Sequence, residues 1–231
     1  SRGLGDVYKR QSPDQTEAAE MLSNVTAAHD YYTRQYGDAA QRDVSVIAHP
    51  QLQGMEYPDV VLARNSQEAV HELAHQWFYS VVGNDQFRDS WLDESLASWA
   101  ATDALRRGIP GANRTIAERL EGFAQRAAGV LSPLFGDISS DMGSHGDSMV
   151  PYVMRVYLQG AGVLEELRNT MGDAAFRSGL RAYVDQQRGQ IATPRDFIAA
   201  MSTAAGRDLS VWFAERGIRA DESPRNDRLP A

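Results

Sequence analysis

Hydrophobic positions recur at two different spacings along the chain, and this change divides it into a short β-type part and a longer helical part. From Ser12-Pro13 to Gly37, apolar and aromatic residues recur at helical spacing, which predicts a first helix. Two β-type runs follow, DVSVIAH at 43–49 and DVVLA at 59–63, separated by a turn-rich link that contains two prolines. We expect these two runs to form a small sheet.

Helical signals dominate the chain beyond the second run. Asn65 with Glu68 three positions later resembles a capping box, and Thr193 with Asp196 repeats this pattern near the end of the chain. We expect helices over 65–83, 92–107, 114–128, 150–171, 173–187 and 194–206, a last one in DLSVWFAERG at 208–217, and a Gly/Ser/Asp-rich loop over 129–147. A small N-terminal sheet followed by a mainly helical part predicts the α+β class with segregated elements.

Composition narrows the classes of protein and of site. The chain has 231 residues, of which 42% are apolar, so one substantial core and a single domain are expected. It lacks an uninterrupted apolar run long enough for a membrane span. With 23 Lys+Arg against 31 Asp+Glu and no basic stripe, a nucleic-acid partner is not expected. Because there is no cysteine, a metal site must use histidines and carboxylates.

The two terminal segments differ from the rest of the chain. The first, SRGLGDVYKRQ at 1–11, has no apolar signal-peptide region and resembles a translated sequencing-adaptor remnant, so we expect it to lie outside the natural protein. The last, DESPRNDRLPA at 221–231, is polar and contains two prolines, which predicts a loose tail. We therefore expect one folded domain at 12–220, while the sequence leaves the compartment and the oligomeric state open.

The segment HELAHQW carries the strongest chemical signal. On a helix, residues four positions apart are about 40° apart in projection, so His71 and His75 can aim ring nitrogens at one point. Glu72 then sits where a metal-bound water would be, which is the H-E-x-x-H arrangement of two zinc ligands and a general base. Catalytic zinc takes three protein ligands. Glu94, in WLDES on the next expected helix, can supply the third if the chain returns antiparallel.

The alternative interpretation of this segment is an amphipathic helix that carries two histidines by chance. A buried structural helix has no use for His-Glu-x-x-His at its core-facing end, because each unpaired buried polar group costs about 1 to 3 kcal/mol. The spacing to the third carboxylate therefore favours the metal site. His29, His49 and His145 have no partner at ligand spacing, and we expect them on the surface or in loops.

Three motifs in the order GMEYP, HELAHQW with WLDES, and PYVMRVYLQG resemble those of one enzyme family. The chain is similar to the zinc aminopeptidases of the gluzincin clan, which include alanyl aminopeptidases and leukotriene hydrolase. Its forms of two motifs, GMEYP and WLDE, resemble those of a bacterial branch of this family. This resemblance covers nearly all of residues 14–217 and implies a thermolysin-like catalytic domain. It implies a zinc ion held by His71, His75 and Glu94, with Glu72 as the base. The reaction it implies is removal of the N-terminal residue from a peptide.

The other two motifs imply further roles. GMEYP resembles the family's Gly-x-Met-Glu-Asn motif, so Gly54, Met55 and Glu56 are expected to bind substrate, with Glu56 holding the α-amine near a sheet edge. Tyr157 matches the tyrosine that assists catalysis, where a phenol O–H stabilises the developing oxyanion. Tyr152 matches a second tyrosine, for which a pocket-wall role is expected. The alternatives are a solvated loop glutamate for Glu56 and a core aromatic for Tyr157.

The chain departs from the family pattern at several positions. Tyr57 replaces the usual Asn, Leu158 and Gln159 replace Glu and Lys, and the usual NEG is DES, with Asp93 and Ser95 on either side of the ligand. These changes bear on pocket shape and substrate preference. Family members also carry an N-terminal β-domain before this region, which we expect to pack on this domain.

Two rival functions are weighed against the aminopeptidase. The first is a zinc endopeptidase on the same scaffold, which would gain nothing from an amine anchor in GMEYP. The second is a non-catalytic interaction module derived from the same fold, which would be expected to lose ligands or base, whereas the sequence has them all.

Overall fold

The described part of the chain comprises residues 15–40, 43–49, 51, 54–109, 137–139, 141–145 and 149–220 of a computed structural model. The adaptor-like segment 1–11, the tail 221–231, the expected helix 114–128 and most of the expected loop 129–147 lie outside the described residues.

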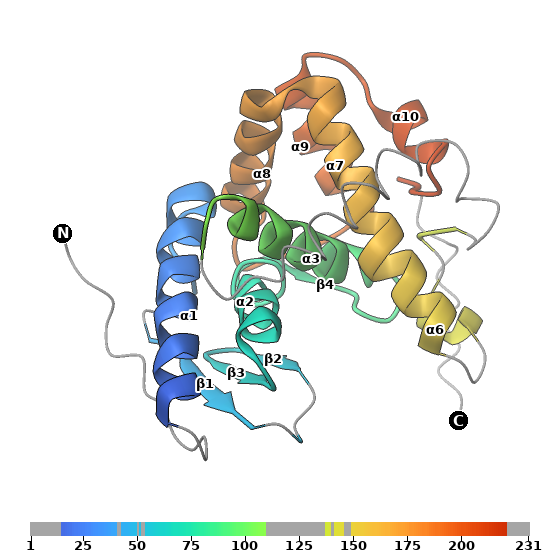
Figure 1. Cartoon of the computed structure of the whole chain (residues 1–231). Coiled ribbons are helices and arrows are strands. Elements are labelled where there is room, and N and C mark those ends of the chain that lie inside the picture. The colour runs from blue at the N-terminus through green and yellow to red at the C-terminus, as the bar shows by residue number, and fades with distance from the viewer. Residues whose placement is uncertain are drawn as a thin grey trace.

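Helices dominate the described residues, and a small sheet lies at one end of the molecule (Figure 1). The strands are β1 (Ser45–Ala48), β2 (Met55–Tyr57), β3 (Val60–Ala63), β4 (Gly83–Asn84) and β5 (Ile191–Ala192). The helices are α1 (Gln15–Tyr36), α2 (Ser66–Ala74), α3 (Trp91–Arg106), α6 (Met149–Tyr152), α7 (Gly160–Met171), α8 (Asp173–Gln187), α9 (Pro194–Ala205) and α10 (Ser210–Ala214). A 3₁₀ turn spans Met142–His145, and a π-helical segment spans Val153–Gln159. The predicted α+β class is confirmed.

The three-stranded sheet has the order β1-β3-β2, so β2 lies at its edge among the described residues. β1 and β3 are the two predicted strands, and they pair in parallel. β2 was not predicted, because its residues fall in the link read as turn-rich. It pairs antiparallel to β3 through a two-residue turn, Pro58-Asp59, in which Asp59 has φ 65°. The edge strand therefore carries the central residues of GMEYP.

Helix α2 lies between α1 and α3 and also packs on β3 (Figure 1). Its core-facing residues Ala69, Val70, Leu73 and Ala74 are all fully buried. Asn65 caps its first turn as predicted, with a side chain that accepts from the Glu68 N–H at 3.0 Å. The helix that carries the H-E-x-x-H segment is thus held rigidly from several sides.

The predicted end of this helix at Gly83 was wrong, because α2 ends at Ala74. Long-range hydrogen bonds hold the following residues in turns instead. The Gln76 side chain donates to the Tyr57 carbonyl at 3.2 Å and accepts from the Asp59 N–H at 3.0 Å. Trp77 Nε1 donates to the carbonyl of Gly37 at 2.7 Å. These bonds tie the segment after α2 to the sheet and to the end of α1.

The C-terminal helices follow the predicted boundaries closely. Thr193 and Asp196 form the predicted capping box at the start of α9, and Gly206, with φ 65°, ends this helix. The predicted helix over 150–171 is one helical stretch of changing type, because the π-helical segment separates α6 from α7. None of the helices in the described ranges combines the length and the apolar character needed to cross a membrane.

Candidate metal centre and active site

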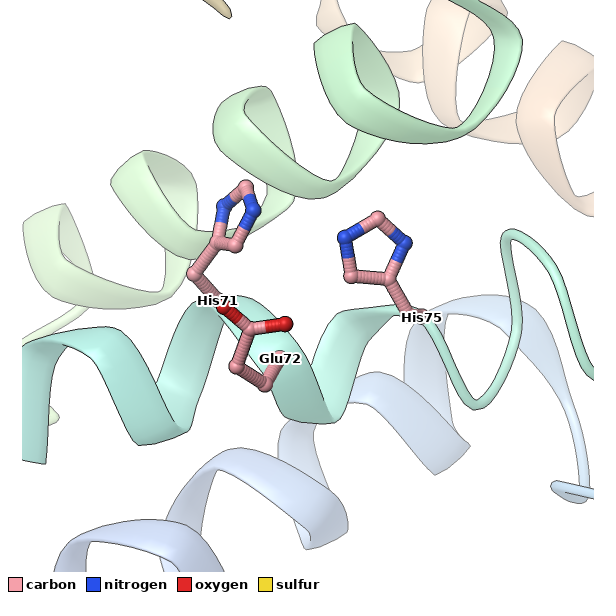
Figure 2. A group of neighbouring side chains, drawn as sticks. All are labelled: His71, Glu72 and His75. Atoms are coloured by element: carbon pink, nitrogen blue, oxygen red, sulfur yellow. The ribbon is translucent and has the colours of Figure 1, made fainter. Parts of the chain in front are cut away.

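His71 and His75 project from the last turn of α2 toward α3, with the Glu72 carboxylate between them (Figure 2). The centroids of the two imidazole rings are 5.0 Å apart. One ligand atom of each of the three residues lies within 4.8 Å of the others. The four-residue spacing therefore brings two nitrogens and a carboxylate to one point, as the sequence indicated.

Glu94 reaches the same point from the first turn of α3. Its Oε2 lies 3.2 Å from His71 Nε2 and 3.4 Å from His75 Nε2. Ligand atoms about 2.0 to 2.1 Å from a tetrahedral zinc ion are about 3.3 Å from one another. Glu94 Oε2 is therefore at zinc-ligand spacing from both ring nitrogens. Glu94 contacts both imidazoles through this one oxygen, which leaves Glu72 free for another role.

The ring of His75 offers an unused lone pair to this centre. The ring is buried, and its Nδ1 lies 3.1 Å from the carbonyl oxygen of Phe78. An N–H at Nδ1 that donates to this carbonyl leaves the lone pair on Nε2. Nε2 is buried, and among the described residues it has no partner of hydrogen-bond geometry, although Glu94 Oε2 approaches it to 3.4 Å. A buried, unpartnered nitrogen aimed at Glu94 Oε2 fits a metal ligand.

The charges around the centre favour a cation. Burial lowers the pKa of His75, but the carboxylates of Glu94, Asp93 and Glu72 outweigh it and raise this pKa to about 10. Burial raises the pKa of Glu94, but His75 and His71 outweigh it and hold this pKa far below its ordinary value. Three carboxylates thus surround two imidazoles. A divalent ion at this point would balance the negative charge of the carboxylates in place of the protons on the imidazoles.

The Glu72 carboxyl is prepared for proton transfer. Burial raises its pKa to about 7, with Glu94 adding to this effect while His71 and His75 oppose it. Its Oε1 lies against the backbone of Gly54, where a Cβ atom would be only 2.1 Å away. The first residue of GMEYP is therefore a glycine because the Glu72 carboxylate occupies the space of a side chain.

Glu56 lies on the edge strand β2 and is half-buried. Gln86 Nε2 donates to Asp93 Oδ2 at 2.9 Å and lies 3.4 Å from Glu56 Oε1, so it links β2 to the start of α3. The Glu56 carboxylate is close enough to raise the pKa of Glu72. Met55, half-buried, precedes it on the same strand. Sequence reasoning did not single out Gln86, because its loop carries no motif.

Tyr157 lies over the metal centre from the π-helical segment. Its ring stacks on His71 with centroids 5.7 Å apart and planes at 24°. Burial, together with the Glu94 carboxylate, raises the pKa of Tyr157 well above its ordinary value. The phenol therefore stays protonated and can donate a hydrogen bond.

Tyr152 packs against Tyr157 edge-on, with ring centroids 6.0 Å apart. In an α-helix, residues five positions apart point about 140° apart. In a π-helix, with roughly 4.4 residues per turn, they are only about 50° apart. The π-helical segment thus places both tyrosines on the face that looks toward the metal centre. Tyr152 is buried, and burial raises its pKa to about 12, so it supports the Tyr157 ring from behind; its expected pocket-wall role stays a prediction.

A cavity of about 620 Å³ opens beside the centre. Its walls include Gly54, His71, Glu72, Ser98, Tyr157 and Leu158. A cavity of this size is within the range of small-ligand sites, and it touches one imidazole, the buried carboxyl and the phenol together. A small ligand in this cavity can therefore reach all three groups at once.

Comparison with known proteins gives the same picture. The sequence model of the Peptidase family M1 domain matches residues 42–215. Aminopeptidase N of Streptomyces lividans is 33% identical over 150 residues, which cover 62% of this chain and 17% of that relative. Aminopeptidase N of Lactococcus lactis subsp. lactis is 31% identical over 159 residues, which cover 64% of this chain and 18% of that protein. The chain thus spans less than a fifth of the length of these relatives.

Solved structures share the fold. A crystal structure of an M1 zinc metallopeptidase from Deinococcus radiodurans superposes with a TM-score of 0.62 at 23% identity, and the alignment covers all of this chain and 49% of that one. This likeness confirms the predicted fold, which the chain shares with an M1 zinc metallopeptidase. Since the family model matches well over half of the residues, the chain belongs to peptidase family M1.

Proposed function

We propose that this chain is the catalytic part of a zinc-dependent aminopeptidase, which hydrolyses the N-terminal residue from peptides. One observation carries the proposal: Glu94 Oε2 lies at zinc-ligand spacing from both imidazoles, while Glu56 lies on the edge strand beside them. Relatives named Aminopeptidase N support it. The chain spans only part of the length of these relatives. We therefore also propose that an N-terminal β-domain packs on this domain in the full protein.

His71, His75 and Glu94 would hold the zinc ion. When bound there, zinc lowers the pKa of a water toward about 7 and polarises the carbonyl of the scissile bond. Glu72 accepts a proton from the attacking water and delivers it to the leaving amine. A pKa of about 7 suits both steps, because the carboxyl can release and regain a proton near neutral pH.

Tyr157 donates a hydrogen bond from its phenol O–H to the carbonyl oxygen as negative charge develops there. Its raised pKa keeps this hydrogen in place, and its position over His71 puts the donor beside the metal centre. Tyr152 holds one side of this ring. The chain therefore supplies a base on one side of the carbonyl and an oxyanion donor on the other.

Glu56 binds the protonated α-amine of the substrate by a charge-assisted hydrogen bond. The outer edge of β2 has no strand partner among the described residues, so an extended peptide can add there as a further strand. Met55 contributes backbone on this edge, and Gly54 leaves room for the Glu72 carboxylate. The substrate class is thus a peptide with an unblocked N-terminus.

The test compares aminoacyl reporter substrates with their N-acetylated forms, with and without a chelator. We expect one zinc ion per chain, loss of activity with the chelator, and strong preference for the unblocked substrate. Glu56→Gln should reduce this preference at least tenfold, since it removes the charge and keeps the shape. Glu215→Gln, at an exposed carboxylate on α10's C-terminal side, is the control and should change nothing.

Equal cleavage of blocked and unblocked substrates by the unaltered chain would favour an endopeptidase on the same scaffold. Absence of bound zinc would instead indicate a non-catalytic module. An unchanged preference in Glu56→Gln would remove the amine anchor from this residue.

A further inference from the structure

The π-helical segment Val153–Gln159 needs support from outside its own helix. A π-helix is rare and less favourable than the α-helix, and it persists where other contacts stabilise it. The Gly160 N–H bonds to the Arg155 carbonyl across five residues, which is the π pattern. The carbonyl of Val156, next along the chain, accepts a bond from another helix.

That donor is Ser95, on α3 and directly after the Glu94 ligand. Its Oγ donates to the Val156 carbonyl at 2.6 Å, and the side chain is fully buried. A buried hydroxyl needs a hydrogen-bond partner, and so does a buried carbonyl, so each satisfies the other. This bond joins the helix of the third metal ligand to the residue that precedes Tyr157.

Gly160 makes the approach of Ser95 possible. A Cβ atom at this position would lie 1.9 Å from Ser95 Oγ and 2.8 Å from Ser95 Cβ. α3 and α7 pack together, so a side chain at position 160 would either turn the hydroxyl of Ser95 away from the Val156 carbonyl or push the helices apart. The sequence also departs from the family pattern here, since NEG is replaced by DES and the new side chain is Ser95.

We propose that Ser95 is a positioning residue, whose bond to the Val156 carbonyl keeps the π-helical segment in the conformation that aims Tyr157 at the carbonyl oxygen of the substrate. This inference rests on the proposed aminopeptidase function. Without the bond, the segment shifts toward regular α-helix, and the directions of Tyr152 and Tyr157 diverge from about 50° toward about 140°. Ser95 touches no substrate and acts only through Tyr157.

The experiment is a double-mutant cycle of Ser95→Ala and Tyr157→Phe, with zinc content, kcat and KM measured for each variant. We expect Ser95→Ala to lower kcat about tenfold, which corresponds to the net contribution of one hydrogen bond, with KM and zinc content unchanged. In the Tyr157→Phe background it should have no further effect on kcat. Ser202→Ala removes a serine that accepts from the Leu209 N–H far from the site, and serves as the matched control.

Equal tenfold losses in both backgrounds would overturn the inference, because Ser95 would then act independently of Tyr157. A second measurement is hydrogen exchange at the amides of 153–159, which should be faster in Ser95→Ala and in Ser95→Gly than in the unaltered chain. Unchanged exchange rates would overturn the inference that Ser95 stabilises this segment, even if the activity of the variants changes. Full activity of Tyr157→Phe would refute Tyr157 as the oxyanion donor in the proposed function. The exchange measurement would still test whether Ser95 stabilises the segment.

Discussion

A single methyl group added at Gly54 tests how closely the proposed base is held. In Gly54→Ala, the new Cβ would lie 2.1 Å from Glu72 Oε1 and 3.1 Å from Glu68 Cγ. Glu72 is buried on α2 and cannot turn into solvent. The carboxylate must therefore retreat within the site, or the strand must move away from the helix.

The size of this retreat follows from the distance. Ordinary van der Waals contact begins at 3.4 Å, so the carboxylate oxygen must move by about 1.3 Å. A displacement of about 1 Å in a reacting group can cost about 100-fold in rate. We expect kcat of Gly54→Ala to fall by about 100-fold, which is about 2.7 kcal/mol in the activation free energy. Zinc binding should persist, because the atoms nearest the added methyl group belong to Glu72 and Glu68 and not to the three proposed ligands.

The assay measures kcat on an aminoacyl reporter together with zinc content. Gly143→Ala makes the same chemical change at an exposed glycine and should leave both quantities unaltered. Wild-type turnover in Gly54→Ala would refute the reasoning, because the base would then tolerate a displacement of this size. Loss of zinc would show that the methyl group disturbs the ligands and not the base.

Three further variants probe the base, the helix that carries it and the buried ion pairs. Glu72→Gln should lower kcat by about 10² to 10⁴ with zinc still bound, and loss of metal in this variant would contradict a role as base alone. Asn65→Ala removes the cap of α2 and should lower the free energy of unfolding by about 1 kcal/mol, measured by denaturant titration; an unchanged midpoint would contradict the capping role. Burial raises the pKa of Glu165, but Arg168 and Arg106 outweigh it and lower this pKa below its ordinary value of 4.5. The stability that the ionised Glu165 provides is present above about pH 4.5 and is lost as the pH falls through the lowered pKa. The free energy of unfolding of Glu165→Gln should therefore fall less steeply in acid than that of the unaltered chain. Parallel curves of this free energy against pH would refute the reasoning.

Much of the metal centre could be predicted from spacing alone. Two histidines four positions apart must share a helix face, and a helical return over eighteen residues can bring Glu94 back to them. The structure brings all three to one point at 3.2 and 3.4 Å. The histidine pair is a local relation, because one turn of a single helix sets it. The contact of Glu94 depends in addition on how α3 packs on α2.

The parts that could not be predicted depend on contacts between distant segments. The strand Met55–Tyr57 exists because β3 pairs with it, although the glycine and prolines around it indicate turns. The hydrogen bonds of Gln86 with Asp93 and Glu56 join a loop to α3 and β2, and no sequence pattern in the loop predicts them. Sequence periodicity reports which face of an element is buried, but not which neighbour buries it.

By itself, the sequence determined the class of fold and most helix starts, and it predicted the proposed ligands and the proposed base, because these follow from residue type and short-range geometry. The tertiary structure decided where α2 ends, since side chains of Gln76 and Trp77 bond to the sheet and to α1 in place of a further helical turn. It also decided the π-helical segment, because Ser95 on another helix satisfies the Val156 carbonyl. In both places a long-range hydrogen bond outweighs the local helical preference, and only the folded chain brings its two partners together.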